Sequence, residues 1–272
     1  IRYSLNPWIT QGHTDRGRHA GAQLPGIQTM VNFDGKASSA CACPLSKVWQ
    51  EHTCTAWQLY AETKPYVMWV EDDIRSFNHG AVSFGCFCPL HMARFSALAG
   101  RPVTREELVA ALLAPGKPHP WRALYFTMQR EIMIETAKML AKTVHRFSPE
   151  THMGLMSSGP RNHTAEGRDW RRFSDALADG QPLHSRPATG IYQEFCLRDN
   201  YWGTDNFLLT RQMLPEGTHE ESEVDNWSFT RYAKSVTYTT LQMATSAAFG
   251  CHGVTLNLYD HAGTPMDKEP EM

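Results

Sequence analysis

Short β-like runs alternate with longer helical runs along this chain of 272 residues, and this order constrains the fold more than any other feature. Strands are expected at Arg2 to Ile9, Tyr66 to Glu71, His152 to Ser157, Thr189 to Glu194, His219 to Val224 and Val254 to Tyr259. Helices are expected between them, over residues 46–62, 89–98, 104–113, 121–146, 168–178, 204–213 and 227–248. Strands that alternate with helices in this way form parallel sheets built from βα units.

Polar and acidic side chains stand at the end of one expected strand after another. They are Asn6 and His13, Glu71, Asp72 and Asp73, Ser157 and Ser158, Gln193 and Glu194, Glu221 and Glu223, and Asn257 and Asp260. In a barrel these ends converge on one mouth, whereas an open doubly wound sheet usually needs a glycine-rich phosphate loop. The sequence has no G-x-G-x-x-G or Walker loop, so we expect a (β/α)8 TIM barrel of the α/β class and no organic cofactor.

A closed barrel needs eight strands, and the pattern supplies six, the first of which begins almost at Ile1. The simplest interpretation is a barrel that lacks its first two βα units. Residues 1–272 are therefore expected to form one catalytic barrel domain that is incomplete at its N-terminus.

Two acidic clusters stand at the ends of expected strands. Glu71, Asp72 and Asp73 come directly after an apolar strand, and adjacent carboxyl groups are placed together where a metal, a substrate or acid–base chemistry requires them, or where they face water. Glu221 and Glu223 share one face of another strand. Glycosidic bond cleavage uses one carboxyl group as proton donor and another as nucleophile or base. Acidic residues before a helix also favour its N-terminal dipole, which is the non-catalytic interpretation of the second cluster.

The cysteines are spaced as metal ligands. Cys86, Cys88 and His91 form a C-x-C-x2-H run, and Cys43 or Cys41 would complete a closed, tetrahedral structural zinc site. Buried cysteines without a metal are the alternative. Seven cysteines cannot all pair in disulfides, which favours reducing, cytoplasmic conditions.

The charge balance excludes several classes of partner. Lys plus Arg number 26 and Asp plus Glu number 28, so no overall field attracts nucleic acid or an anionic membrane, and no apolar run is long enough to span a bilayer. Aromatic and polar side chains near strand ends instead favour an oligosaccharide or glycoside partner. The sequence leaves open whether the protein forms a homo-oligomer. The candidate substrate-binding residues are Asn6, Trp8, His13, His79, Tyr192, Glu194, Trp227 and Asp260.

The order of these features resembles the (β/α)8 glycoside hydrolases, and among them the zinc-carrying β-galactosidases of family 42. The resemblance is carried by Trp69 to Asp73 at a strand end, the C-x-C run with Phe95 after it, Glu223 before Trp227, and Tyr259-Asp260 after the last strand. It implies Asp73 as acid/base and Glu223 as nucleophile. It also implies zinc ligands at Cys43, Cys86, Cys88 and His91.

The chain departs from the family pattern at the acid. Asp72-Asp73 stands where the family has Asn-Glu, which makes the proton donor one methylene shorter and makes Glu71 a rival. We expect a β-galactosidase-like retaining glycosidase that uses one carboxyl group of residues 71–73 together with Glu223. One alternative is a metal-dependent barrel, a sugar isomerase or hydrolase, with a divalent ion held by Glu71, Asp72, Asp73, His79 and Glu194. Another is a carbohydrate-binding protein without catalysis.

Overall fold

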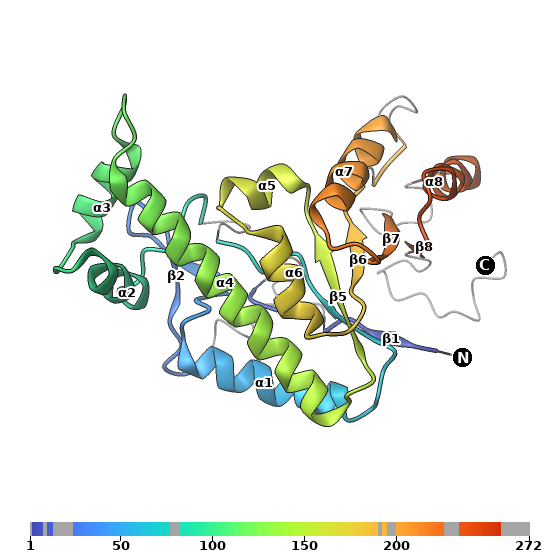
Figure 1. The fold of residues 1–272 in the computed structure, drawn as a ribbon, viewed down its shortest axis with the longest axis horizontal. Coiled ribbons are helices and arrows are strands. Elements are labelled where there is room, and N and C mark those ends of the chain that lie inside the picture. Colours follow the sequence, from blue (N-terminus) through green and yellow to red (C-terminus); the bar gives the residue numbers. More distant parts are fainter. Residues whose placement is uncertain are drawn as a thin grey trace.

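The structure is a computed structural model that describes residues 2–7, 10–12, 24–76, 82–189, 192–194, 200–225 and 234–256. Its centre is a curled parallel sheet with strand order β1-β4-β5-β6-β7-β8, and a separate antiparallel hairpin is formed by β2 and β3 (Figure 1). The strands are β1 (Ser4–Leu5), β2 (Thr29–Val31), β3 (Ala37–Ala42), β4 (Val67–Val70), β5 (His152–Ser157), β6 (His184–Pro187), β7 (His219–Val224) and β8 (Gly253–Leu256). The predicted α/β class with a parallel sheet is confirmed.

Helices connect successive strands of this sheet, as the alternation predicts. They are α1 (Lys47–Ala61), α2 (Pro89–Ala99), α3 (Arg105–Leu113), α4 (Pro120–Phe147), α5 (Pro160–Ala165), α6 (Trp170–Ala178), α7 (Asn200–Met213) and α8 (Val236–Ala248). The predicted capping box is present at α3, where Thr104 and Glu107 exchange side-chain and backbone hydrogen bonds. Helix α8 begins at Val236, later than predicted, because Ser235 caps it and its hydroxyl accepts the N–H of Tyr238.

The strand predicted at Thr189 to Glu194 is wrong. The sheet instead takes His184–Pro187, which pairs with β5 on one side and β7 on the other, and the described residues of 189–194 are not in a strand. The run His-Ser-Arg-Pro has weak strand propensity, so its place is decided by its neighbours in the sheet rather than by local sequence. The hairpin β2–β3 and the short helix α5 were not predicted.

One face of the sheet is buried under helices. Side chains of β4 and β5, including Met68 and Leu155, pack against Trp57 of α1, Leu140 of α4 and Phe173 of α6. Helix α4 runs the length of this layer, with α1 and α6 beside it (Figure 1). Because side chains alternate along a strand, the next residues point to the opposite, concave face.

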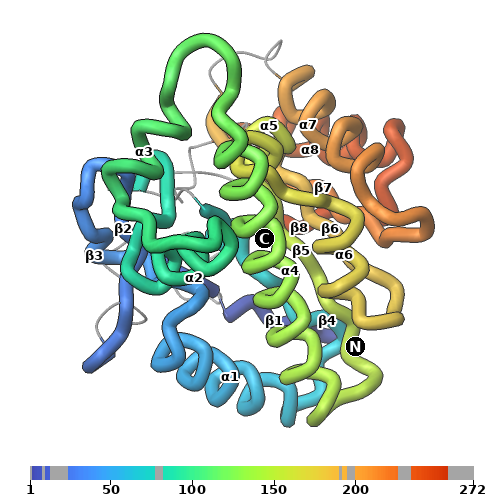
Figure 2. The backbone as a smooth tube through the Cα atoms, turned by 60° about the vertical axis from the view of Figure 1, so that its left-hand side comes forward, coloured from blue at the N-terminus to red at the C-terminus, as the bar shows by residue number. Residues whose placement is uncertain are grey.

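The hairpin β2–β3 lies beside α2 and α3, on the opposite side of the molecule from α7 and α8 (Figure 2). A second core holds this region, in which Phe95, Leu108 and Tyr125 are buried. This packing leaves the segment that carries Cys86 and Cys88 between the hairpin and α2. Among the residues described, no helix combines the length and apolarity needed to cross a membrane.

Candidate active site

The C-terminal ends of the parallel strands bring two carboxylates to one guanidinium. Arg186 on β6 places Nη1 3.0 Å from Oε1 of Glu223, at the end of β7, and Nη2 3.8 Å from Oε1 of Glu71, after β4. The guanidinium is a rigid planar fork, so these two carboxylate oxygens are at most about 9 Å apart. This range includes the separations used by both retaining and inverting glycosidases.

Glu223 is almost enclosed. Its side chain is 5% exposed, and Oε2 accepts a hydrogen bond from the hydroxyl of Tyr192 at 3.2 Å. Burial raises the pKa of Glu223, while the positive charge of Arg186 and the Tyr192 hydrogen bond oppose the rise. Arg186 therefore favours the ionised form of this carboxyl group.

Glu71 faces the same space from the other side. Asn6, which follows β1, donates a hydrogen bond from Nδ2 to Oε2 of Glu71 at 2.9 Å. The backbone N–H of Glu71 donates to the hydroxyl of Thr10 at 3.1 Å. The carboxyl group is therefore oriented by Asn6 and Arg186, and its side chain is 12% exposed.

Asp72 belongs to a separate charge network. It forms an ion pair with Arg75 at 3.3 Å and accepts a hydrogen bond from Ser158, at the end of β5. Burial raises the pKa of Asp72, but the Arg75 charge and the Ser158 hydroxyl outweigh it, so the pKa is lowered overall. Asp72 is therefore held as a carboxylate.

Asp73 is directed away from this space and is 0% exposed. Its carboxylate accepts backbone N–H groups of Thr10, Gln11 and Gly12, the last two at 2.8 and 2.7 Å. Burial raises the pKa of Asp73 to about 7, although the N–H groups of Gly12 and Gln11 favour the charged form. The turn needs glycine at position 12, because a Cβ there would lie 2.1 Å from the carbonyl oxygen of Ala40. Asp73 thus fixes the backbone after β1.

Of the remaining predicted substrate-binding residues, the structure describes only Glu194. Glu194 accepts the backbone N–H of Ser235 at 2.7 Å, at the N-terminus of α8. The others, Trp8, His13, His79, Trp227 and Asp260, lie outside the described residues.

Four of the predicted metal ligands do converge. Cys43, after β3, lies with Cys86, Cys88 and His91, and their donor atoms are all within 4.8 Å of one another. His91 Nδ1 is 3.3 Å from Cys43 Sγ and 3.4 Å from Cys88 Sγ, and all four residues are buried. Cys41 faces elsewhere and contacts the carbonyl of Gly12 through Sγ. Within the described ranges, the acidic residues 71–73 and Glu194 form no such group.

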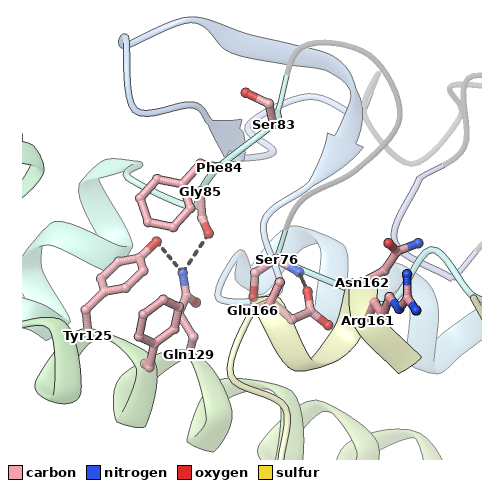
Figure 3. Close-up of a pocket in the computed structure, with 11 residues that line it drawn as sticks. Ser76, Ser83, Phe84, Gly85, Tyr125, Gln129, Arg161, Asn162 and Glu166 are labelled. Carbon is pink, nitrogen blue, oxygen red and sulfur yellow. Dashed lines mark hydrogen bonds between the residues drawn. The ribbon is translucent and has the colours of Figure 1, made fainter. Parts of the chain in front are cut away.

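A cavity of about 250 Å³ lies between helices α4 and α5 and the loop residues Ser76 and Gly85 (Figure 3). Gln129 of α4 crosses one wall, where its amide donates to the carbonyl of Gly85 and the hydroxyl of Tyr125. On the other wall Glu166 accepts the backbone N–H of Ser76. None of the predicted site residues that the structure describes lines this cavity.

Comparison with known proteins identifies the fold. No family model matches the sequence, and no curated protein matches it. Among solved structures, the chain is similar to the β-galactosidase of the psychrophilic Marinomonas ef1, with TM-score 0.62, 11% identity, and coverage of 93% of this chain and 43% of that one. The fold is that of part of these β-galactosidases. The Halorubrum lacusprofundi β-galactosidase gives TM-score 0.56 at 14% identity, with coverage of 93% and 42%. A catalytic mutant of a GH42 β-galactosidase from G. stearothermophilus gives 0.58 at 13%, with 94% and 41%.

The chain therefore spans about two fifths of the length of the β-galactosidases it matches. The likeness covers the sheet with its carboxylates, because it extends over more than nine tenths of this sequence. At these identities it shows a shared fold.

Arg186 is the residue that sequence reasoning missed. Its strand was predicted too late in the chain, so the arginine was assigned to no site. One signal was available, because carboxylates buried together in a predicted mouth need a compensating cation. No local pattern identified which arginine supplies it.

Proposed function

We propose that this protein is a glycoside hydrolase of β-galactosidase-like specificity, with Glu223 as nucleophile and Glu71 as acid/base. The observation that carries the proposal is the single guanidinium of Arg186 that faces both carboxylates at the C-terminal ends of parallel strands. In barrel enzymes this end of the sheet carries the catalytic residues. The fold shared with β-galactosidases supports the same activity class.

The neighbours of each carboxyl group suit different steps. Glu223, whose ionised form Arg186 favours and which Tyr192 orients, attacks the anomeric carbon. The bond between that carbon and the leaving oxygen breaks as Glu71 gives its proton to the oxygen. Glu71 then takes a proton from water, whose oxygen displaces Glu223 from the sugar with net retention.

The other two acids have different tasks in this proposal. Asp72 is held ionised by Arg75 and is a poor proton donor. Asp73 is enclosed by the N–H groups of residues 10–12 and does not reach the substrate. The role that the family resemblance implied for Asp73 is therefore assigned here to Glu71, which also restores the glutamate length of the proton donor.

The sheet supplies six of the eight strands of a (β/α)8 barrel in this proposal, and residues 1–272 belong to its catalytic domain. Strands β1 and β8 are at the two edges of the described sheet. Two further strands between those edges would close the barrel and remove the unpaired backbone groups.

The test is hydrolysis of a panel of nitrophenyl glycosides by the full-length protein and by Glu223→Gln and Glu71→Gln. We expect turnover of a β-galactoside or a related sugar, and a loss of at least about 10⁴-fold in Glu223→Gln. Glu216→Gln is the matched control, because it makes the same change in an exposed residue before β7.

Azide separates the two carboxyl roles. In a Glu223→Ala variant, azide attacks the sugar from the vacated side and should yield a glycosyl azide of inverted configuration. In Glu71→Ala, it should yield one of retained configuration. Full turnover by Glu223→Gln on every substrate that the wild type hydrolyses would contradict the proposal.

We also propose that Cys43, Cys86, Cys88 and His91 hold a structural zinc ion. Three thiolates and an imidazole are a typical closed zinc set, and all four side chains are buried with no position for substrate. The ion would tie the hairpin β2–β3 to the N-terminus of α2.

Metal analysis and unfolding test this site. Cys88→Ser should reduce the zinc bound by one equivalent and lower the melting temperature by several degrees, because structural zinc contributes directly to folding. Cys54→Ser, on α1 outside the cluster, should retain the zinc. Equal zinc content in the two variants would exclude the assignment.

A further inference from the structure

A row of imidazoles crosses the other end of the sheet. His152, His184 and His219 are the first residues of β5, β6 and β7, and His252 directly precedes β8. The ring centroids of neighbours are 5.4 Å apart from His152 to His184, 4.6 Å from His184 to His219 and 4.5 Å from His219 to His252. These histidines are more than thirty residues apart in sequence and meet because each begins a neighbouring parallel strand.

Glu221 joins two of these imidazoles at a single oxygen. Its Oε1 is 3.2 Å from Nδ1 of His184 and 3.3 Å from Nδ1 of His219. His184 is in hydrogen-bonding geometry with this oxygen. His219 Nδ1 is shielded from solvent and makes no hydrogen bond within the described part of the chain. The hydrogen bond with His184 thus leaves Nδ1 of His219 directed at the same oxygen without a hydrogen bond of its own in the described residues.

A cation satisfies all three groups at once. The three donor atoms lie within 4.8 Å of one another, and ligands about 2.1 Å from a tetrahedral zinc ion are roughly 3.4 Å apart. Two imidazole nitrogens and one carboxylate oxygen are ligands suited to zinc and to the neighbouring transition metals. We propose that His184, His219 and Glu221 bind a divalent transition-metal ion.

This site is distinct from the two already described. His184 and Arg186 share one face of β6, and Glu221 and Glu223 share one face of β7, so the ion would lie one layer below the carboxylates, about 7 Å along the strands. Its ligands include no thiolate, unlike the Cys43 cluster. The exposed fractions of the side chains are 3% for His184, 21% for Glu221 and 39% for His219, so the site is open on the His219 side. A bound ion would link β6 to β7 and neutralise Glu221.

The test is a titration of the metal-free, full-length protein with Co²⁺, followed by absorption and by direct metal analysis. We expect one equivalent with the intense thiolate-to-cobalt band of a cysteine site. We expect a second equivalent that adds only weak visible bands, as for nitrogen and oxygen ligands. Zn²⁺ should displace both ions.

Variants distinguish the loss of this metal site from a loss of the fold. His219→Gln and Glu221→Gln should weaken the second equivalent at least about tenfold while the thiolate band is unchanged, and this band reports that the fold is intact. His52→Gln, an exposed histidine on α1, should bind both equivalents. The proposal is overturned if the wild type binds no ion besides a thiolate-bound one, or if both variants bind the second ion as tightly as the wild type. Neither outcome depends on glycosidase activity.

Discussion

The two ends of β6 and β7 carry ion pairs of different kinds on the same face of the sheet. At the C-terminal end, Arg186 meets Glu223 at 3.0 Å, and the cation is permanent. At the N-terminal end, His184 and His219 meet Glu221, and their charge depends on a proton or a metal ion. Each carboxylate in the concave face thus has its compensating group at the same end of the strands. The end with the permanent cation suits an anionic nucleophile, and the end with imidazoles suits a metal.

Removal of Arg186 tests the C-terminal end of these strands and has a larger expected effect than the two variants considered after it. Arg186→Met leaves Glu223 without the charge that opposes its burial, so the pKa of Glu223 rises further. In the proposed mechanism Glu223 attacks in its ionised form, so the acidic limb of the kcat/KM profile should move to higher pH. At neutral pH, kcat/KM should fall at least about 100-fold. The measurement is a pH–rate profile on the best nitrophenyl glycoside.

The metal site proposed at the N-terminal end of β6 and β7 supplies the control. Arg186→Met should still bind the second, thiolate-free cobalt equivalent, because His184, His219 and Glu221 are unchanged. Arg172→Met, which removes an exposed guanidinium paired with Glu131 on α4, should keep the wild-type profile. An unshifted profile in Arg186→Met would show that Arg186 does not set the charge of Glu223.

The contrast also separates what sequence can and cannot predict. Strands β5 and β7 have the predicted bounds. Glu71 and Glu223 were selected from the sequence because acidic residues stand together at the ends of predicted strands. The four metal-binding candidates were found because Cys86, Cys88 and His91 are close in sequence.

The missed features depend on contacts between distant segments. His184 and Arg186 belong to a strand with little local strand propensity, stabilised by pairing with β5 and β7. The imidazole row joins residues of four strands, and no spacing rule connects them. The catalytic role predicted for Asp73 rests on its position in a motif, and the orientation of its carboxyl group depends on the backbone of residues 10–12.

Unfolding at acid pH tests the charge of a buried histidine on α5. His163 of α5 is buried, its Nδ1 is 3.0 Å from Glu166, and Arg168 lies nearby. Burial and the positive charge of Arg168 together lower the pKa of His163 to about 4, although Glu166 opposes the shift. The unfolded chain binds this proton near pH 6.5, so stability is fully present above that pH. It should fall by on the order of 3 kcal/mol as the pH drops from 6.5 to 4.

Urea unfolding at several pH values measures this loss. His163→Gln should flatten the dependence of the unfolding free energy on pH between 4 and 6.5, because the glutamine amide does not titrate. His52→Gln, which changes an exposed residue, should keep the wild-type slope. Identical slopes for the wild type and His163→Gln would show that His163 is protonated as easily in the folded protein as in the unfolded chain.

Asp73→Asn has the smallest expected effect and tests most directly the division of roles among the three acids. The carboxylate accepts N–H groups of Thr10, Gln11 and Gly12, whereas an amide directs its own N–H groups at some of these donors. The variant should therefore lose about 1–3 kcal/mol of unfolding free energy, measured with urea. Activity per folded molecule should stay within a few-fold of wild type, whereas Glu71→Gln should lose activity and keep its stability. The opposite result, a fully stable Asp73→Asn without turnover, would return the proton-donor role to Asp73.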